Sequence, residues 1–121
     1  FVRSKGGEFA LKISLIIYAK KQLENITVIE KIPLFLKLYE KFIEEKPAKV
    51  NHQTRKLEWN FPKLEAGERR FISYIIYSKV GILGKFALPR STAIYEQEGK
   101  THETNSNKVF FVTEQKKERD E

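Results

Sequence analysis

The chain has 121 residues, no cysteine and a formal net charge of +7, with 40% hydrophobic and 32% charged residues. This length suits one domain with a genuine core. The lack of cysteine excludes disulfides, thiolate zinc sites and cysteine nucleophiles. No apolar run approaches the roughly 18 residues of a membrane span. Because the chain does not begin with Met, we expect a piece of a longer protein, with any membrane attachment through parts outside it.

The positive charge is concentrated in the first half, where residues 1–63 carry 13 Lys and Arg against 7 Glu. A basic half can indicate a nucleic-acid or polyanion partner. The lysines alternate with glutamates instead of clustering, which favours a solvated, thermophile-like exterior, so we expect no nucleic acid. The alternative, a polyanion-binding domain, would use Lys12, Lys20, Lys21, Lys31, Lys37, Lys41, Lys49, Arg55 and Lys56.

The first third of the chain predicts a lead-in and two strands. Residues 1–8 form a lead-in or linker that ends in Gly6-Gly7. Every odd position of residues 9–17 is apolar, a period of two that predicts a strand with one buried face. After a polar loop, a second alternating run around Ile26 and Val28 extends to a stop at Pro33.

Residues 34–43 are ambiguous between helix and strand. A helix would place Phe35, Leu38, Tyr39 and Phe42 on one face. Propensity favours the helix slightly, whereas the surrounding strands favour extended chain. We predict a strand here, followed by a short extended run within residues 47–54.

The centre of the chain predicts an antiparallel pair of strands around the single tryptophan. Leu57, Trp59 and Phe61 alternate with polar residues, and Pro62 is predicted to end that strand, because proline has no N–H for a sheet. Gly67 lies in the following turn, where we expect a positive φ. A second strand is predicted over residues 70–77. We expect Trp59 to be buried between two sheets.

The last third predicts further short strands. Gly81 and Gly84 bracket a turn, residues 91–96 form a strand, and Glu98-Gly99-Lys100 is a hairpin tip. Residues 108–113 close a domain that spans residues 9–113, and residues 114–121 are a charged tail. Seven or eight short strands separated by turns predict an all-β, antiparallel, immunoglobulin-like β-sandwich.

An ordered set of short motifs resembles the conserved-repeat module of archaeal and bacterial surface proteins, the domain of unknown function eleven. The resemblance implies an immunoglobulin-like sandwich, an exported or cell-surface location, tandem copies and no enzymatic activity. This chain departs from the family in its many lysines, its single Asp and a bulkier segment at residues 34–46. The matching residues are Asn25, Val28, Ile32-Pro33, Leu57, Trp59, Leu64, Gly67-Glu68, Ser73-Tyr74, Ser106-Asn107 and Val109.

Catalytic and metal-binding residues are not indicated by the sequence. His52 and His102 are the only histidines, and without cysteine they form no recognisable ligand spacing. Paired glutamates lie in turn-like stretches, where solvated carboxylates keep ordinary acidity. The glycine pairs lack the strand-to-helix setting of a phosphate-binding loop. Ser91-Thr92 and Ser106 have no partnering base. We therefore predict no catalytic residue, no metal and no cofactor.

The sequence leaves two possible sites for sugars or other ligands. Asn25-Ile26-Thr27 fits the N-glycosylation pattern, so Asn25 is a candidate glycosylation site if the protein is exported. Aromatic residues could form a stacking platform for sugars or bases, which would indicate a carbohydrate-binding module, although alternation favours a core role for Trp59. The aromatic residues concerned are Trp59, Phe61, Phe71, Tyr74 and Tyr77.

We expect Asn107 to anchor the closing strand. Residues 109–112 are apolar on both faces, so a one-residue slip would leave the pattern unchanged. A partly buried Asn107 side chain bonded to main chain would fix the register. Trp59, Gly67 and Asn107 are thus predicted structural residues. The expected function is a non-catalytic structural or adhesion module of a surface or exported protein, with other domains of that protein or cell-surface proteins as partners.

Overall fold

The computed structural model describes residues 2–3, 9–78, 84–107 and 109–113. Within these residues the chain is all-β, and no helix is present that could cross a membrane. Gly6-Gly7, Gly81 and the charged tail at residues 114–121 lie outside the described part. The strands are β1 (Val2–Arg3), β2 (Phe9–Tyr18), β3 (Leu23–Lys31), β4 (Lys37–Tyr39), β5 (Lys49–Asn51), β6 (Lys56–Leu64), β7 (Arg69–Ser78), β8 (Gly84–Leu88), β9 (Thr92–Gln97), β10 (Lys100–Asn105) and β11 (Val109–Thr113).

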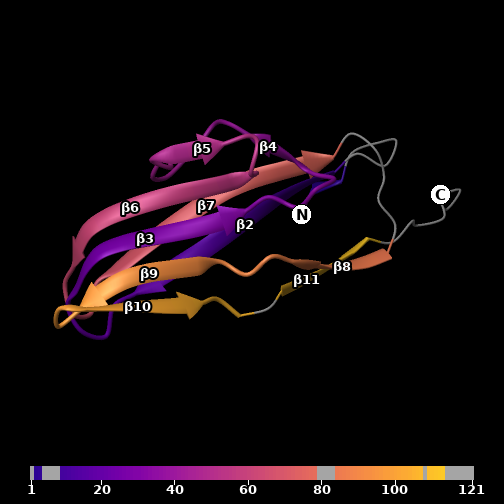
Figure 1. The fold of residues 1–121 in the computed structure, drawn as a ribbon. Helices are drawn as coiled ribbons and strands as arrows, with labels where there is room; N and C mark the ends of the chain where they lie inside the picture. Colours follow the sequence, from indigo (N-terminus) through magenta and orange to yellow (C-terminus); the bar gives the residue numbers. More distant parts are fainter. Residues whose placement is uncertain (1, 4–8, 79–83, 108, 114–121) are drawn as a thin grey trace, which may run out of the picture.

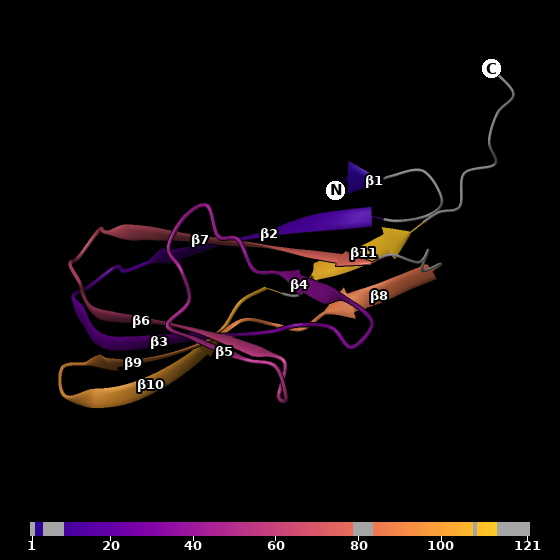
Figure 2. The same ribbon diagram turned by 90° about the horizontal axis from the view of Figure 1, so that it is seen from above.

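The strands form two antiparallel layers, which confirms the predicted β-sandwich (Figure 1; Figure 2). The β2–β7 sheet has the order β1-β2-β7-β4, and the β3–β6 sheet has the order β10-β9-β3-β6-β5. Strands β8 and β11 pair with each other and extend the β9–β10 hairpin along the molecule (Figure 1). The described residues form eleven strands, more than the seven or eight predicted. Three were not predicted: β1, in the expected lead-in, β8, which begins at Gly84 where a turn was expected, and β10, after the hairpin tip.

The hydrophobic core lies between the two layers and follows the alternation in the sequence. Trp59 is 1% exposed, which confirms its predicted burial. Its ring lies 6.1 Å from that of Tyr74 in the opposite sheet, and its Nε1–H donates to the Glu45 carbonyl at 3.0 Å. Buried apolar side chains from both sheets complete the core: Phe9, Ala19, Ile26, Val28, Ile32, Leu36, Leu57, Phe61, Leu64, Ile72 and Ile76.

The turn between β6 and β7 has the backbone predicted for it. Gly67 has a φ of +85°, a left-handed conformation that L-residues rarely adopt. Its N–H donates to the Ala19 carbonyl at 2.7 Å, and the Ala19 N–H donates to the Glu68 carbonyl at 3.1 Å. The turn therefore also fixes the end of β2.

The prediction that Pro62 ends its strand is wrong, because β6 continues through Pro62 to Leu64. The β3–β6 pairing joins Ile26 to Phe61 and Glu24 to Lys63, so Asn25 and Pro62 face each other without a bridge. Asn25 has a φ of +47° and lies at a bulge, where the register between β3 and β9 shifts. A missing N–H is tolerated at such an irregularity, since no ladder hydrogen bond is lost there.

Residues 34–43 form a strand only at β4, and most of the segment is loop. Arg55 explains why extended pairing does not continue. Its guanidinium donates to the carbonyls of Ile32, Pro33 and Leu36, so these groups are satisfied by a side chain and not by a neighbouring strand. The loop leaves Leu34, Phe35 and Ile43 between 74% and 81% exposed.

The β9–β10 hairpin has the predicted tip. Gln97 and Lys100 pair across a two-residue loop formed by Glu98 and Gly99, whose φ values are +52° and +77°. Two consecutive positive φ values are those of the tight turn whose twist matches the flanking strands.

Candidate functional site

Strand β2 has a long backbone edge that is mostly unpaired. Strand β1 pairs only with Phe9 and Ala10, so among the described residues no strand covers the outer edge of residues 11–18. The Ala19 N–H and C=O both point toward the β6–β7 turn. Because this direction alternates along a strand, the N–H and C=O groups of Lys12, Ser14, Ile16 and Tyr18 point to the free edge.

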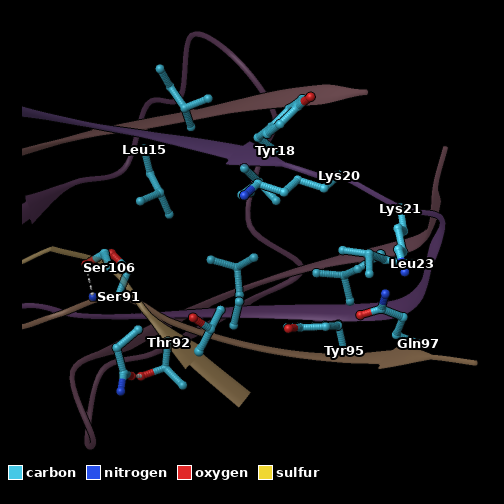
Figure 3. Close-up of a pocket in the computed structure, with 17 residues that line it drawn as sticks. Leu15, Tyr18, Lys20, Lys21, Leu23, Ser91, Thr92, Tyr95, Gln97 and Ser106 are labelled. Carbon is cyan, nitrogen blue, oxygen red and sulfur yellow. Dashed lines mark hydrogen bonds between the residues drawn. The ribbon is translucent and has the colours of Figure 1, made fainter. Parts of the chain in front are cut away.

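A groove with a volume of about 690 Å³ runs between this edge and the β9–β10 hairpin (Figure 3). Leu15 and Lys20 lie on one side, while Thr92, Tyr95 and Gln97 lie on the other (Figure 3). Four strands (β2, β3, β9 and β10) and three positions outside strands (Lys20-Lys21, Ser91 and Ser106) contribute to the wall. The lining residues are Leu15, Ile16, Ile17, Tyr18, Lys20, Lys21, Leu23, Ile26, Val28, Ser91, Thr92, Ala93, Tyr95, Gln97, Thr104, Asn105 and Ser106.

The apolar side chains along the groove are only half covered. Leu11, Ile13, Leu15 and Ile17 point inward from β2, yet none is fully buried. All residues of β9 are half-buried, and all residues of β10 are exposed. The β3–β6 sheet thus extends past β2 by a hairpin whose inner face has no opposite layer among the described residues.

One end of the groove is cationic. Lys20 and Lys21 line it, and the lining residues include no Asp or Glu. The Arg69 guanidinium lies 5.2 Å from the centre of the Tyr18 ring at the same end of β2. Glu68, close to Ala19, is held by Arg70 at 2.9 Å. The groove therefore combines an apolar floor with two lysines at one end and no acidic side chain in its lining.

The other end is held by two serines that join β9 to the segment after β10. The Ser91 N–H donates to Ser106 Oγ at 2.9 Å, and the Ser106 N–H donates to the Ser91 carbonyl at 2.9 Å. Thr92 Oγ1 bonds to Asn105 Oδ1 at 3.0 Å. These bonds fix the point where the hairpin passes from β9–β10 to β8–β11.

Behind the serines lies a carboxylate that is 1% exposed, Glu30 of β3. It accepts hydrogen bonds from Tyr74 Oη at 3.1 Å and from Ser91 Oγ. Burial raises the pKa of Glu30 above its ordinary value, while the two hydroxyl donors act in the opposite direction. Burial and the neighbouring carboxylate raise the pKa of Tyr74. The phenol therefore stays protonated and keeps donating.

This cluster suits a structural role better than bond cleavage. A serine nucleophile needs a base and access to substrate. Ser91 is 9% exposed, and its hydroxyl is engaged with a carboxyl whose remaining oxygen is held by Tyr74. No buried polar side-chain atom in the described part of the chain lacks a partner. The cluster therefore presents no unsatisfied group to a ligand.

The histidines and glutamate pairs do not assemble into a site. His52 Nε2 lies 3.0 Å from Glu40 Oε1 in an exposed pair, and the His102 ring stacks on Tyr95 at 5.5 Å. Glu45 and Glu96 bond to Arg70 and Asn25, respectively. Among the described residues, no group of three His, Cys, Asp or Glu side chains could hold a metal ion.

The aromatic side chains are divided between the two faces of the sheets. Trp59, Phe61 and Tyr74 are buried in the core, whereas Phe71 is 54% exposed and Tyr77 is half-buried on the outer face of β7. The five residues therefore do not form one stacking platform. On the same outer face, Tyr18 and Tyr39 are also partly exposed.

The candidate glycosylation site at Asn25 is exposed, but within β3 and not at a loop-to-strand junction. Its Nδ2 donates to Glu96 Oε2 at 3.1 Å. The bulge turns the side chain toward β9, which is why the amide meets a residue 71 positions away. Sugar attachment at Asn25 stays a prediction.

The prediction of a partly buried Asn107 is wrong, because Asn107 is exposed. No hydrogen bond of its side chain is found among the described residues; only its main-chain carbonyl accepts one, from Ser106 Oγ at 3.2 Å. The polar anchor expected before β11 is instead Ser106, whose side chain and N–H both bond to Ser91. A hydroxyl is short enough to reach the adjacent backbone, whereas the longer amide extends into solvent.

The basic residues of the first half are dispersed. Lys20 and Lys21 lie at the groove, Lys31 and Lys56 pair at the far end of the β3–β6 sheet, and Arg55 is used by the β3–β4 loop. Lys20 and Lys21 thus lie apart from Lys31, Arg55 and Lys56, which are neighbours at the other end of the β3–β6 pair. Comparison with protein-family models, curated proteins and solved structures gives no match.

Neither the burial of Glu30 nor the groove was predicted from the sequence. A signal for Glu30 was present, because it occupies the position between Val28 and Ile32 in an inward-facing alternating row. A charged residue in such a row is expected to be buried and hydrogen-bonded. The groove had no comparable signal, because it depends on how far the two sheets overlap.

Proposed function

We propose that this chain is a non-catalytic, immunoglobulin-like structural or adhesion module of a larger cell-surface or exported protein. The proposal includes membership of the conserved-repeat surface modules, on the motifs between Asn25 and Val109. The observation that carries it is the long, uncovered edge of β2 beside an apolar groove. This feature provides a docking surface, whereas the buried polar cluster is satisfied internally.

The location is tested on intact cells of the source organism. An antibody against the folded domain is used to follow the full-length protein before and after external protease treatment. We expect the signal to be lost from intact cells, while a cytoplasmic control protein keeps its signal. Protection of the domain until the cells are lysed would contradict the proposal.

A carbohydrate-binding module is the second candidate, because Tyr18, Tyr39 and Phe71 are between 43% and 54% exposed on one face of the β2–β7 sheet. Exposed aromatic faces can stack on sugar rings. Retention of the domain on insoluble polysaccharide, lost in Tyr18→Ala and Phe71→Ala, would favour this candidate. If both variants were retained as well as the native domain, this candidate would be contradicted.

A further inference from the structure

We propose that the groove beside β2 receives an extended segment of a partner protein, which adds as a strand to the free edge of β2 and carries acidic residues at one end. The inference rests on the proposed adhesion function and names its partner class. Strand addition to an exposed sheet edge is a general mode of peptide recognition, in which backbone bonds provide affinity and side-chain pockets provide specificity.

The first support is the contrast between β2 and the other edge strands. Exposed edges in soluble proteins are blunted by shortness, charge, proline or bulges. Strands β4 and β5 have three residues each, and β10 is polar along its whole length. Residues 13–18 of β2 include four apolar residues and Tyr18, with no charge and no proline. Of the outer edges of the two larger sheets, only that of β2 is long, apolar and unprotected.

The second support is the geometry of the unpaired backbone. The groups of Ser14, Ile16 and Tyr18 face the free edge at the spacing at which an added strand would exchange hydrogen bonds. Every strand pair in the described part of the chain is antiparallel. We therefore place the added segment antiparallel to β2, so that its amino-terminal end lies near Tyr18.

The third support is the uncovered face opposite the edge. An added strand would lie above the β9–β10 hairpin, and alternate side chains would enter the groove. There they would meet the half-buried Leu15, Ile17 and Tyr95. The segment should thus alternate apolar and polar residues, with apolar side chains on the groove side.

The positive charge at the Tyr18 end of the edge favours a partner segment with acidic residues. Lys20, Lys21 and Arg69 lie at the Tyr18 end of the edge, and the groove lining has no acidic side chain. Carboxylates near the amino-terminal end of an antiparallel segment would meet these cations. A second copy of this chain is a poorer occupant, because β2 has no Asp or Glu that could meet these cations, and each copy has a net charge of +7.

The test uses the folded domain labelled with ¹⁵N and a synthetic peptide, acetylated and amidated, in which two glutamates precede alternating valine and threonine. We expect saturable binding and slowed hydrogen exchange at the amides of Ser14, Ile16 and Tyr18. The same peptide should not bind when N-methyl groups replace the amide hydrogens on the peptide edge that would pair with β2. Binding without protection of these amides, equal binding of the N-methylated peptide, or no binding would overturn the proposal.

Three variants separate backbone pairing from charge. Ser14→Pro removes an edge N–H without breaking a β2–β7 bond and should abolish binding, with the fold checked by tryptophan fluorescence. If Ser14→Pro does not fold, the N-methylated peptide decides. The double variant Lys20→Glu/Lys21→Glu should weaken binding roughly tenfold. The matched double variant Lys31→Glu/Lys56→Glu changes two exposed lysines outside the groove lining, at the opposite end of β3 from Lys20 and Lys21, and should change affinity by less than about twofold.

Equal weakening by both double variants would show a non-specific charge effect and overturn the acidic-partner assignment. Protection of the Ser14 and Ile16 amides that rises with protein concentration in the absence of peptide would identify a second copy as the occupant, and would likewise overturn it. The protease experiment on intact cells reports location without reference to the groove. A failure of peptide binding is therefore distinguishable from a failure of the proposed function.

Discussion

Tyr74 of β7 donates its phenolic hydrogen to the Glu30 carboxylate of β3, with 3.1 Å between Oη and Oε2, and thereby links the two sheets through the core. Ser91 donates to the other carboxylate oxygen from the start of β9. One buried acid thus joins three segments that are far apart in the sequence. A buried group with several polar partners rigidifies a core when all partners are present.

Glu30 should make the stability of the domain fall as pH rises above the ordinary value of 4.5. Its pKa is raised in the folded state, so the folded protein holds this proton more tightly than the unfolded chain does. The associated stabilisation is present below pH 4.5 and is lost as pH rises through the folded pKa. Urea unfolding across this window should show the fall in the native domain and a smaller fall in Glu30→Gln. Identical slopes would contradict the assignment.

Glu68 provides an internal comparison for that titration. Its pKa is lowered, first by the Glu65 N–H and then by Arg70. Its contribution is therefore present above pH 4.5 and is lost as pH falls through the folded pKa. The two carboxylates affect stability in different pH ranges. Glu68→Gln should therefore leave the slope of unfolding free energy against pH unchanged above pH 4.5.

Replacement of Trp59 by Ala should lower the free energy of unfolding by roughly 3–5 kcal/mol. The side chain is 1% exposed, and its loss leaves a cavity facing Tyr74 and frees the Glu45 carbonyl. Trp59→Phe keeps most of the packing and should cost less. Chemical unfolding followed by circular dichroism measures both, since the fluorophore is absent. A cost below about 1 kcal/mol for Trp59→Ala would place the residue outside the core.

Gly67→Val should destabilise the domain through backbone strain alone. No atom lies within 4 Å of a Cβ built at Gly67, so the cost arises from its φ of +85°. A left-handed conformation costs an L-residue about 1–2 kcal/mol, and more when the residue is β-branched. Ala66→Val, in the same exposed turn, is the matched control and should be nearly neutral. Equal melting temperatures for the two variants would show that the turn adapts.

Ser106→Ala should cost about 1–3 kcal/mol, because the Ser91 N–H loses its acceptor at a partly buried position. Asn107→Ala should change stability by less than about 0.5 kcal/mol, since the side chain is exposed. The two neighbouring variants are compared by thermal and urea unfolding. A larger loss from Asn107→Ala than from Ser106→Ala would show that Asn107, and not Ser106, anchors the segment before β11.

Much of the fold was predictable because it depends on local pattern. The alternation in β2, the Trp59 strand, the positive φ at Gly67 and the tip at Glu98-Gly99 are set by residues close in sequence. Predictions failed where a distant partner decided the outcome. Strand β6 continues through Pro62 because a bulge at Asn25 lies opposite it. The segment between β3 and β4 remains a loop because Arg55 donates hydrogen bonds to its carbonyls.

The sequence by itself determined the fold class, the inward faces of the strands and the absence of cysteine chemistry, because composition and a period of two are properties of the chain alone. Only the tertiary structure decided which strand became the open edge, where the groove formed, and that Glu30 meets Tyr74 and Ser91. These features depend on the order of strands in each sheet and on the overlap of the layers. That arrangement depends on many residues that are distant in the sequence, and no local pattern encodes it.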